Sequence, residues 1–349
     1  MPKDASPWME VLAHYSLGRV ISLEAGGGTA ASKVWVSTAQ EGRYLLRSRR
    51  PAASEDEVIA FDHGVIRAVV EAGLPSVAPE MSREGRTWVR LDERAYELFP
   101  VIEGLAPFQP GNRRQLAAAA QTLARFHRAT AGLTPPGRKH WEREHRIEAM
   151  RDTLAEVLAG ASGAPDRADA VAMLASAQKL ARAPLSSWAR ALPSAIIHGD
   201  YTPANVLFRA GQVGGIFDYD WVSRQPRIVD LGEALIFFAF ARREPINPDS
   251  IWSLVQGWEP DLIAARAFLA AYQAEWPLDR EEARALPFFM RETWLGVRIR
   301  AMRKVRPDEQ LRILTQGGLE PLQWLEQAPH LVEGLVGESA SLAGMRPTG

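Results

Sequence analysis

The residues with the clearest chemical potential lie in one stretch, 196–221, which reads IIHGDYTPANVLFRAGQVGGIFDYDW. Asp200 is followed by Asn205 and then by Asp218. Such oxygen ligands suit a hard cation such as Mg²⁺, which proteins usually bind through one or two carboxylates together with substrate phosphates. Phosphoryl transfer needs a carboxylate for the accepting hydroxyl and oxygen ligands for the metal ion. The residue types therefore point to phosphoryl transfer.

Two short strands must position these side chains. The segments 206–208 and 215–217 are apolar and β-prone, and 210–212, which reads Ala-Gly-Gln, is a turn. A strand pair closed by such a turn brings its far ends together. We therefore expect the acids and the amide of this stretch to lie close together at the open end of the hairpin.

The order of these residues follows the catalytic segments of kinases. The kinase catalytic loop has the form H-R-D-x-x-x-x-N, and a metal-binding Asp follows in D-F-G. Here His198, Asp200 and Asn205 keep that spacing, with Gly199 in place of Arg. The later motif is Asp-Tyr-Asp, beginning at Asp218, rather than Asp-Phe-Gly. The alternative is a surface hairpin with incidental acids and a capping Asn.

Three motifs together carry a family resemblance: HGDYTPANVL at 198–207, GGIFDYDW at 214–221 and PRIVDLG at 226–232. In these the chain resembles the aminoglycoside phosphotransferase-like kinase superfamily. That group includes type II homoserine kinases, choline kinases, methylthioribose kinases and aminoglycoside kinases, and a bacterial stress-response protein kinase also resembles it. The resemblance implies an α+β, protein-kinase-like fold with a small β-rich lobe and a larger, mainly helical lobe.

The roles of the large-lobe residues follow from this comparison. Asp200 would orient the acceptor hydroxyl as its base, and Asn205 and Asp218 would hold Mg²⁺. His198 and Asp230 would support the catalytic loop without taking part in proton transfer. The cofactors implied are Mg²⁺ and ATP, with GTP left open.

The small lobe holds the expected nucleotide site. A Gly-rich turn joins the strands expected at 20–23 and 33–38, and its backbone N–H groups could cover phosphates; its residues are Gly26, Gly27, Gly28 and Thr29. Arg47, on the next strand, stands where kinases usually have Lys and could bind phosphate bidentately. Its expected partner is Asp62 on the helix predicted at 56–72, with Glu55 and Glu57 as rivals. The alternatives are a flexible hairpin tip and exposed carboxylates on a helix face.

The segment ELFPVIEG at 97–104 resembles the hinge between the two lobes, whose backbone binds a purine edge. Glu97, Phe99 and Val101 are therefore nucleotide candidates by resemblance only. Without that resemblance, the segment reads as an edge strand and a Pro/Gly turn.

Length and composition set the broad class. A chain of 349 residues is long for one core, and we expect a nucleotide-binding lobe at 1–100, a hinge at 101–104, a catalytic and substrate-binding lobe at 105–338 and a flexible tail at 339–349. The net charge of −1 favours neither nucleic acid nor an anionic membrane as a partner. The absence of cysteine excludes thiolate chemistry. The N-terminus has no apolar signal core and the longest apolar run, at 234–241, is too short to cross a bilayer, so we expect a cytoplasmic protein.

Beyond residue 105 the sequence is mostly helical, with an amphipathic helix expected at 113–130 and another expected from Pro226 to about Arg242. Several residues of this region could contact the acceptor. Asp220 is a candidate to support the site, to bind a second metal ion or to touch the substrate. Trp221 and Trp294 could stack on a ring or a cationic group, and Glu233 and Glu292 could contact an amine. Core packing for each Trp and solvation for each Glu are the alternatives.

The short connection from Asp218 to Asp230 decides between acceptor classes. Only eleven residues, 219–229, lie between them, which leaves little room for the phosphorylated activation segment of a protein kinase. We therefore expect a small-molecule hydroxyl as acceptor: an amino alcohol, a sugar or an aminoglycoside-like compound, with a homoserine kinase-like activity included. A stress-response-type Ser/Thr protein kinase and an inactive nucleotide-binding scaffold are the alternatives. The oligomeric state is open.

Overall fold

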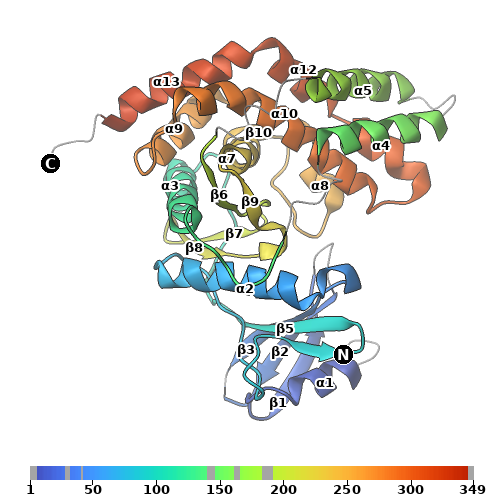
Figure 1. The fold of residues 1–349 in the computed structure, drawn as a ribbon, viewed down its shortest axis with the longest axis vertical. Helices are drawn as coiled ribbons and strands as arrows, with labels where there is room; N and C mark the ends of the chain where they lie inside the picture. The colour runs from blue at the N-terminus through green and yellow to red at the C-terminus, as the bar shows by residue number, and fades with distance from the viewer. Residues whose placement is uncertain are drawn as a thin grey trace.

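The computed structural model describes residues 6–27, 32–40, 42–139, 146–160, 166–182 and 192–344. Two lobes lie one above the other, a twisted sheet and a larger helical body, with helix α2 (Asp56–Glu71) running between them (Figure 1). This arrangement confirms the predicted α+β, protein-kinase-like fold. None of the described helices combines the length and the apolar character that a membrane span requires.

The small lobe is an antiparallel sheet of five strands in the order β1-β2-β3-β5-β4. Its elements are α1 (Ser6–Leu12), β1 (Val20–Ala25), β2 (Ser32–Thr38), β3 (Arg43–Ser48), β4 (Val89–Leu91) and β5 (Arg94–Pro100). Alternate residues of the strands, such as Val34 and Val36, are buried, and they form one cluster with Val11 and Leu12 of α1. The period-two burial is what a sheet with one covered face requires. β3 lies in the middle of this sheet, where its position is fixed on both sides.

Helix α2 packs its apolar side against the helical lobe. Phe61, Val65, Ile66 and Val69 belong to the same continuous hydrophobic cluster as the interior of that lobe. The helix ends before Gly73, whose φ of +73° suits a glycine that terminates a helix. Because α2 is connected to the sheet through the chain and packs into the core of the helical lobe, it fixes the position of one lobe relative to the other.

The described part of the helical lobe contains three short strand pairs among its helices. Its helices are α3 (Arg113–Thr130), α4 (Ile147–Gly160), α5 (Arg167–Ala181), α7 (Ile228–Ala234), α8 (Ile251–Leu254), α9 (Leu262–Gln273), α10 (Arg280–Met302), α11 (Gln310–Thr315), α12 (Leu319–Gln327) and α13 (Pro329–Gly344). Its strands are β6 (Ser194–Ile197), β7 (Val206–Arg209), β8 (Gln212–Ile216), β9 (Ser223–Pro226), β10 (Ala241–Arg242) and β11 (Trp258–Glu259), paired β6 with β9, β7 with β8 and β10 with β11. Local signals account for the helix starts: Asn112 caps α3, and Asp279 with Glu282 forms a capping box on α10.

Two expectations about the helical lobe are wrong. The helix expected from Pro226 to about Arg242 ends at Ala234 and continues as a π-helical turn, Leu235–Ala239, because the next residues pair as β10 with β11. The tail expected to be flexible from residue 339 is helical to Gly344, because Ser339 is buried and accepts a hydrogen bond from Gln273 at 2.6 Å. Residues 345–349 lie outside the described part.

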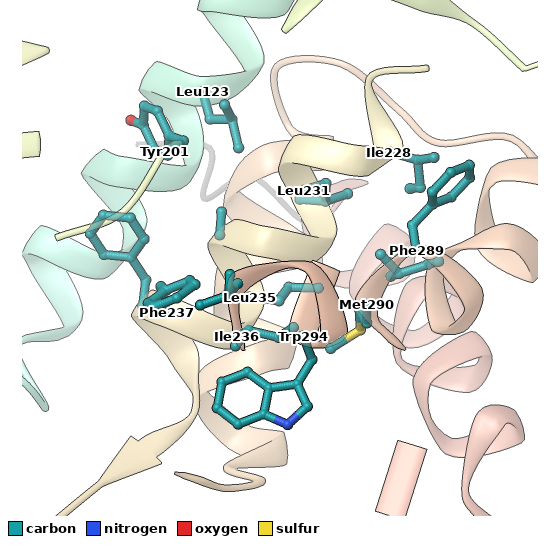
Figure 2. Close-up of a cluster of buried hydrophobic side chains, with 14 of the residues drawn as sticks. Leu123, Tyr201, Ile228, Leu231, Leu235, Ile236, Phe237, Phe289, Met290 and Trp294 are labelled. Carbon is teal, nitrogen blue, oxygen red and sulfur yellow. The ribbon is translucent and has the colours of Figure 1, made fainter. Parts of the chain in front are cut away.

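Trp294, proposed from the sequence as a substrate contact, belongs to the core. Figure 2 shows it on α10 among Leu235, Ile236 and Met290. Its side chain is fully buried, and its indole N–H donates to the carbonyl of Gly318 at 2.9 Å. With its polar atom satisfied inside the protein, Trp294 packs α10 against α7 and does not reach a ligand.

Candidate active site

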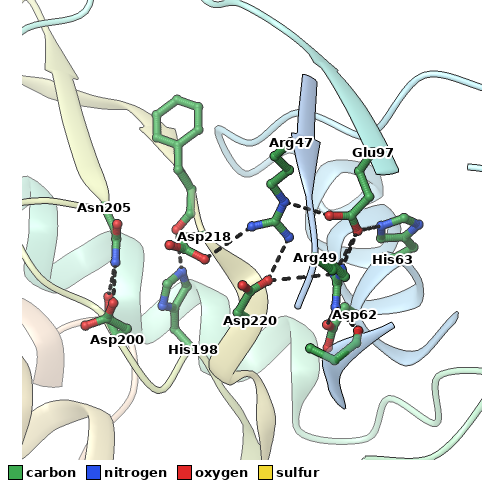
Figure 3. Close-up of polar contacts among 12 residues, drawn as sticks. Arg47, Arg49, Asp62, His63, Glu97, His198, Asp200, Asn205, Asp218 and Asp220 are labelled. Atoms are coloured by element: carbon green, nitrogen blue, oxygen red, sulfur yellow. Dashed lines mark hydrogen bonds and ion pairs between the residues drawn. The ribbon is translucent and has the colours of Figure 1, made fainter. Parts of the chain in front are cut away.

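The β7–β8 hairpin gathers the predicted catalytic residues. The amide N–H of Phe217 donates to the carbonyl of Asn205 at 2.9 Å, which places the end of β8 beside the start of β7. The side-chain amide of Asn205 donates to Oδ2 of Asp200 at 2.7 Å and to its carbonyl at 3.0 Å. Asp218 follows Phe217 directly, so the two acids and the amide converge at the open end of the hairpin, as the sequence predicts (Figure 3).

Asp218 adopts an unusual backbone conformation. Its φ of +61° lies in the left-handed region, which a non-glycine residue enters at an energetic cost. The ring of His198 holds the preceding residue, with Nε2 lying 3.0 Å from the carbonyl oxygen of Phe217. Because a carbonyl only accepts, this Nε2 carries the proton. His198 is fully buried, so its position favours a supporting role.

Gly199 stands where the kinase loop has Arg, and the structure leaves no room for a side chain there. Its φ is +75°, and a Cβ built on it would lie 2.5 Å from the carbonyl oxygen of Trp221. At Gly199, the loops that carry Asp200 and Asp220 therefore approach each other more closely than any side chain at this position would allow.

The carboxylate of Asp230 binds the backbone of the loop that leads into Asp200. Its carboxylate accepts from the backbone N–H of His198 at 2.6 Å and of Gly199 at 2.8 Å, and it lies 3.1 Å from Nε2 of His127. The other ring nitrogen of His127 lies 2.8 Å from the hydroxyl of Tyr272. A buried carboxylate with several hydrogen bonds is a rigid support. The geometry agrees with the structural role expected of Asp230.

The environment of Asp200 raises its basicity. Burial raises the pKa of this carboxyl above its usual value, and the charge of Asp218 raises it further. The hydrogen bond from Asn205 and the guanidinium of Arg300 act in the opposite direction. A carboxylate with a raised pKa is a better acceptor for a hydroxyl proton at neutral pH.

Arg47 is held by three carboxylates and not by the partner that the sequence predicted. Its Nε donates to Glu97 at 2.6 Å and its Nη2 to Asp220 at 2.7 Å, while Nη1 lies 3.5 Å from Asp218 (Figure 3). The predicted Arg47–Asp62 pair is therefore wrong. Asp62, which lies on α2, is instead paired with two other cations.

The two cations that bind Asp62 are Arg49 and Lys139, and the sequence analysis predicted neither of them. Arg49 donates to Asp62 at 2.7 Å and to Glu97 at 2.8 Å. Lys139, from the segment after α3, donates to Asp62 at 2.6 Å and to the carbonyl of Asp220 at 2.6 Å. The sequence held a signal for Arg49: it lies two residues after Arg47, just past the end of β3, and residues two apart in an extended chain share a face. No local pattern could place Lys139.

Glu97 organises the small-lobe side of the site. It is fully buried, accepts from both arginines, and lies 2.6 Å from Nε2 of His63. Burial alone would raise its pKa, but the two arginines reverse the effect and hold the pKa well below its usual range. With its carboxylate engaged on every side, Glu97 supports Arg47 and its side chain does not face a nucleotide.

The other nucleotide candidates lie around this cluster. The ring of Phe99 lies 5.5 Å from the Arg47 guanidinium carbon, and the N–H of Val101 donates to the carbonyl of Arg43 at 3.0 Å. At the Gly-rich turn, a Cβ on Gly27 would lie 2.5 Å from a carboxylate oxygen of Asp249 in the helical lobe, and the N–H of Gly26 donates back to Lys33 at 2.9 Å. Gly28 and Thr29 lie outside the described residues.

Of the acceptor candidates, Glu233 and Trp221 lie beside the catalytic loop and Glu292 does not. The N–H of Tyr201 donates to Glu233 at 3.0 Å, and the guanidinium of Arg300 lies over the Trp221 ring, 5.7 Å from its centroid. Glu292 faces α4, where burial and the charge of Glu148 raise its pKa to about 8.

Comparisons with known proteins agree with this geometry. Residues 23–286 match the model of the phosphotransferase enzyme family. A homoserine kinase from Bradyrhizobium sp. (strain BTAi1) is 26% identical over 284 residues, covering 81% of this chain and 79% of the relative. One from Beijerinckia indica is 27% identical over 283 residues, covering 80% and 79%.

Solved structures share the fold at low identity. The microcompartment-associated aminopropanol kinase superposes with a TM-score of 0.68 at 17% identity, covering 98% of this chain and 99% of its own. An amicoumacin kinase superposes with a TM-score of 0.62 at 15% identity, covering 95% and 93%. Since the family model spans more than half of the sequence, this chain belongs to the phosphotransferase enzyme family.

Proposed function

We propose that this phosphotransferase moves the γ-phosphoryl group of Mg²⁺-bound ATP to the hydroxyl of a small molecule. The observation that carries the proposal is the convergence of Asp200, Asn205 and Asp218 opposite Arg47. The acceptor oxygen forms a bond to the γ-phosphorus while the bond from that phosphorus to the β–γ bridging oxygen breaks, and ADP leaves. The hydroxyl proton passes to the Asp200 carboxylate.

The donor atoms at the hairpin end fit a magnesium ion. The amide nitrogen of Asn205 is engaged by Asp200, which leaves its carbonyl oxygen as a ligand. The side chain of Asp218 is 32% exposed, so its carboxylate is accessible from solvent. Among the described residues no group of three His, Cys or acidic side chains forms a metal cluster. One carboxylate and one amide, completed by phosphate oxygens, make a ligand set of the kind that Mg²⁺ takes in kinases. The bound ion would neutralise phosphate charge.

Arg47 is suited to hold the phosphates. Its weakest contact is the one with Asp218, at 3.5 Å, and this is the carboxylate that a metal ion would engage. Releasing that contact frees Nη1 for a phosphate oxygen, while Glu97 keeps the guanidinium oriented through Nε. A permanently charged, planar group in this position replaces the usual Lys.

The segment after Asp218 supports a small acceptor. It passes through a single 3₁₀ turn, Tyr219–Trp221, and then pairs as β9 with β6 in the register Ile197↔Ser223. No residues remain for an activation segment that could bind a protein substrate. The names of the relatives point the same way, since they are kinases of homoserine and aminopropanol. The protein-kinase alternative has no specific observation in its favour.

A phosphate-transfer screen tests the proposal. The purified protein is incubated with Mg²⁺ and either ATP or GTP against pools of amino alcohols, hydroxy acids, sugars and aminoglycosides, with casein as a protein substrate. Mass spectrometry detects the gain of one phosphoryl group. We expect a phosphorylated small molecule that disappears in Asp200→Asn.

Three other outcomes would overturn the proposal. Phosphate on casein alone would make the enzyme a protein kinase. Nucleotide binding without transfer to any alcohol would make it a scaffold. Unchanged transfer in Asp200→Asn would remove Asp200 as the base.

A further inference from the structure

We propose that Arg300 recognises an anionic group, a carboxylate or a phosphate, on the acceptor whose hydroxyl reaches Asp200. The inference rests on the proposed function and narrows its acceptor class. It makes Arg300, a residue outside every motif of the sequence, the residue that determines specificity.

Contacts place Arg300 on the acceptor side of the catalytic loop. Tyr201, the residue after Asp200, is bonded through its N–H to Glu233, and the other oxygen of Glu233 lies 3.9 Å from Nη2 of Arg300. The Arg300 guanidinium also lies over the ring of Trp221. The Arg300 guanidinium is also a charged neighbour of the Asp200 carboxylate, the group that would receive the hydroxyl proton. Arg300 therefore lies where an acceptor, rather than the nucleotide, would bind.

Among the described residues, the local structure holds the Arg300 guanidinium in place with no hydrogen bond from its N–H groups. Gly296 lies one turn before Arg300 on α10, and a Cβ there would lie 3.2 Å from Nη1 of Arg300, so the glycine leaves the space that the guanidinium occupies. In the part of the chain that the structure describes, the nearest carboxylate to Arg300 is beyond hydrogen-bond distance. The side chain is 24% exposed. A positioned, accessible guanidinium with its donors unused is suited to a carboxylate or phosphate.

The charges around Arg300 also favour the binding of an anionic group. Burial raises the pKa of Glu233 to about 8, and the charge of Asp200 adds to the effect, so at neutral pH Glu233 is largely protonated and does not cancel Arg300. Lys304 lies one turn further along, where Asp200, Arg300, Asp218 and Arg50 are its charged neighbours. The face of α10 that carries Arg300 thus forms a cationic wall beside Asp200. Such a wall repels polycationic acceptors such as aminoglycosides and attracts anionic ones.

The test uses acceptors in matched pairs that differ only in the anionic group. The carboxylate arm compares L-homoserine with 3-aminopropan-1-ol and glycerate with ethylene glycol. The phosphate arm compares glycerol 3-phosphate with glycerol. An aminoglycoside is the cationic probe. We expect the anionic member to have a kcat/KM at least about tenfold higher, as the loss of one charge-assisted hydrogen bond implies. The arm that shows the preference identifies the anion.

Variants assign the preference to Arg300. Arg300→Gln should leave the KM of ATP within about twofold and should lower kcat/KM for the anionic acceptor about tenfold more than for its neutral partner, mainly through a raised KM. Arg300→Lys, which keeps the charge, should recover part of the loss. The matched control is Arg306→Gln, since Arg306 is an exposed arginine just beyond the end of α10. Thermal unfolding of each variant separates a folding defect from lost recognition.

Several results would overturn the inference. A preference for neutral or cationic acceptors, or an equal loss on both members of a pair in Arg300→Gln, would do so while leaving the proposed function intact. A raised KM for ATP would instead assign Arg300 to the nucleotide. If no alcohol accepts phosphate at all, the proposed function fails and this inference fails with it.

Discussion

The ammonium of Lys139 lies 2.6 Å from a carboxylate oxygen of Asp62 and joins two parts of the chain that are 77 residues apart. The same nitrogen donates to the carbonyl of Asp220. Asp62 belongs to α2, which is attached to the sheet, and Asp220 belongs to the 3₁₀ turn Tyr219–Trp221 that follows the β7–β8 hairpin. Lys139 therefore links the small lobe to the residues that follow Asp218, the proposed metal ligand. Arg49 and Arg47 continue the link to Glu97 on β5.

Removing the Lys139 charge should slow catalysis without abolishing it. In Lys139→Met, the carbonyl of Asp220 loses a charged donor and buried Asp62 keeps Arg49 alone. Breaking one partner of a buried pair costs about 3–5 kcal/mol at most, and less here because a second cation remains. We expect a kcat lowered about tenfold or more and a melting temperature lowered by several degrees. The control is Arg138→Met, an exposed neighbour; equal losses in both variants would contradict the link.

Asp218→Asn should uncouple nucleotide binding from the metal ion. The amide is a weaker ligand for a hard cation than the carboxylate. Titration calorimetry with ATP in the presence of Mg²⁺, and again with a chelator, should show a large Mg²⁺-dependent gain in the parent and a gain reduced about tenfold or more in the variant. An unchanged gain would remove Asp218 from the metal site.

Arg47→Lys should retain more activity than Arg47→Ala. Lys keeps a charge near the phosphates but loses the fork that reaches Glu97 and Asp220 together. In the Ala variant, Arg49 and His63 are left to satisfy Glu97. The KM of ATP should follow the order parent, Lys, Ala. Arg43→Ala, an exposed position on the same strand, is the control. Equal activities of the Lys and Ala variants would exclude Arg47 from phosphate binding.

Glu292 should make stability depend on pH. Its pKa is raised from 4.5 to about 8 in the folded protein, so the folded state keeps a proton that the unfolded chain releases. Stability is therefore full below about pH 4.5 and falls as the pH rises towards 8. At pH 8.5, Glu292→Gln should have a free energy of unfolding higher than that of the parent by on the order of 1–2 kcal/mol, since this group is only half-buried, and should therefore melt at a higher temperature. At pH 5 the melting temperatures of the two proteins should match.

Melting curves across this pH range test the effect. Glu71→Gln, at an exposed position on α2, is the control and should leave the pH dependence unchanged. A parallel pH dependence in parent and Glu292→Gln would show that another group is responsible.

The sequence by itself determined the features that depend on neighbouring residues. The helix predicted at Arg113–Thr130 has those bounds in the structure, because its apolar stripe and its N-cap lie within the same turns. The catalytic hairpin was predictable for the same reason: its turn and its alternating strands are contiguous, and closing them brings Asp200, Asn205 and Asp218 together. The family was indicated by the resemblance that the motifs at 198–207, 214–221 and 226–232 carry.

Only the tertiary structure decided the contacts between distant segments. The partner of Asp62 could not be read from the sequence, because a buried carboxylate is satisfied by whichever cations the packing of two lobes brings near it, here Arg49 and Lys139. Trp294 was open to a functional or a core role until the packing of α10 against α7 enclosed it. The position of Arg300 beside Glu233 depends on that same packing. Local patterns specify helices and strands, but burial and charge pairing between lobes are settled only when the whole chain is folded.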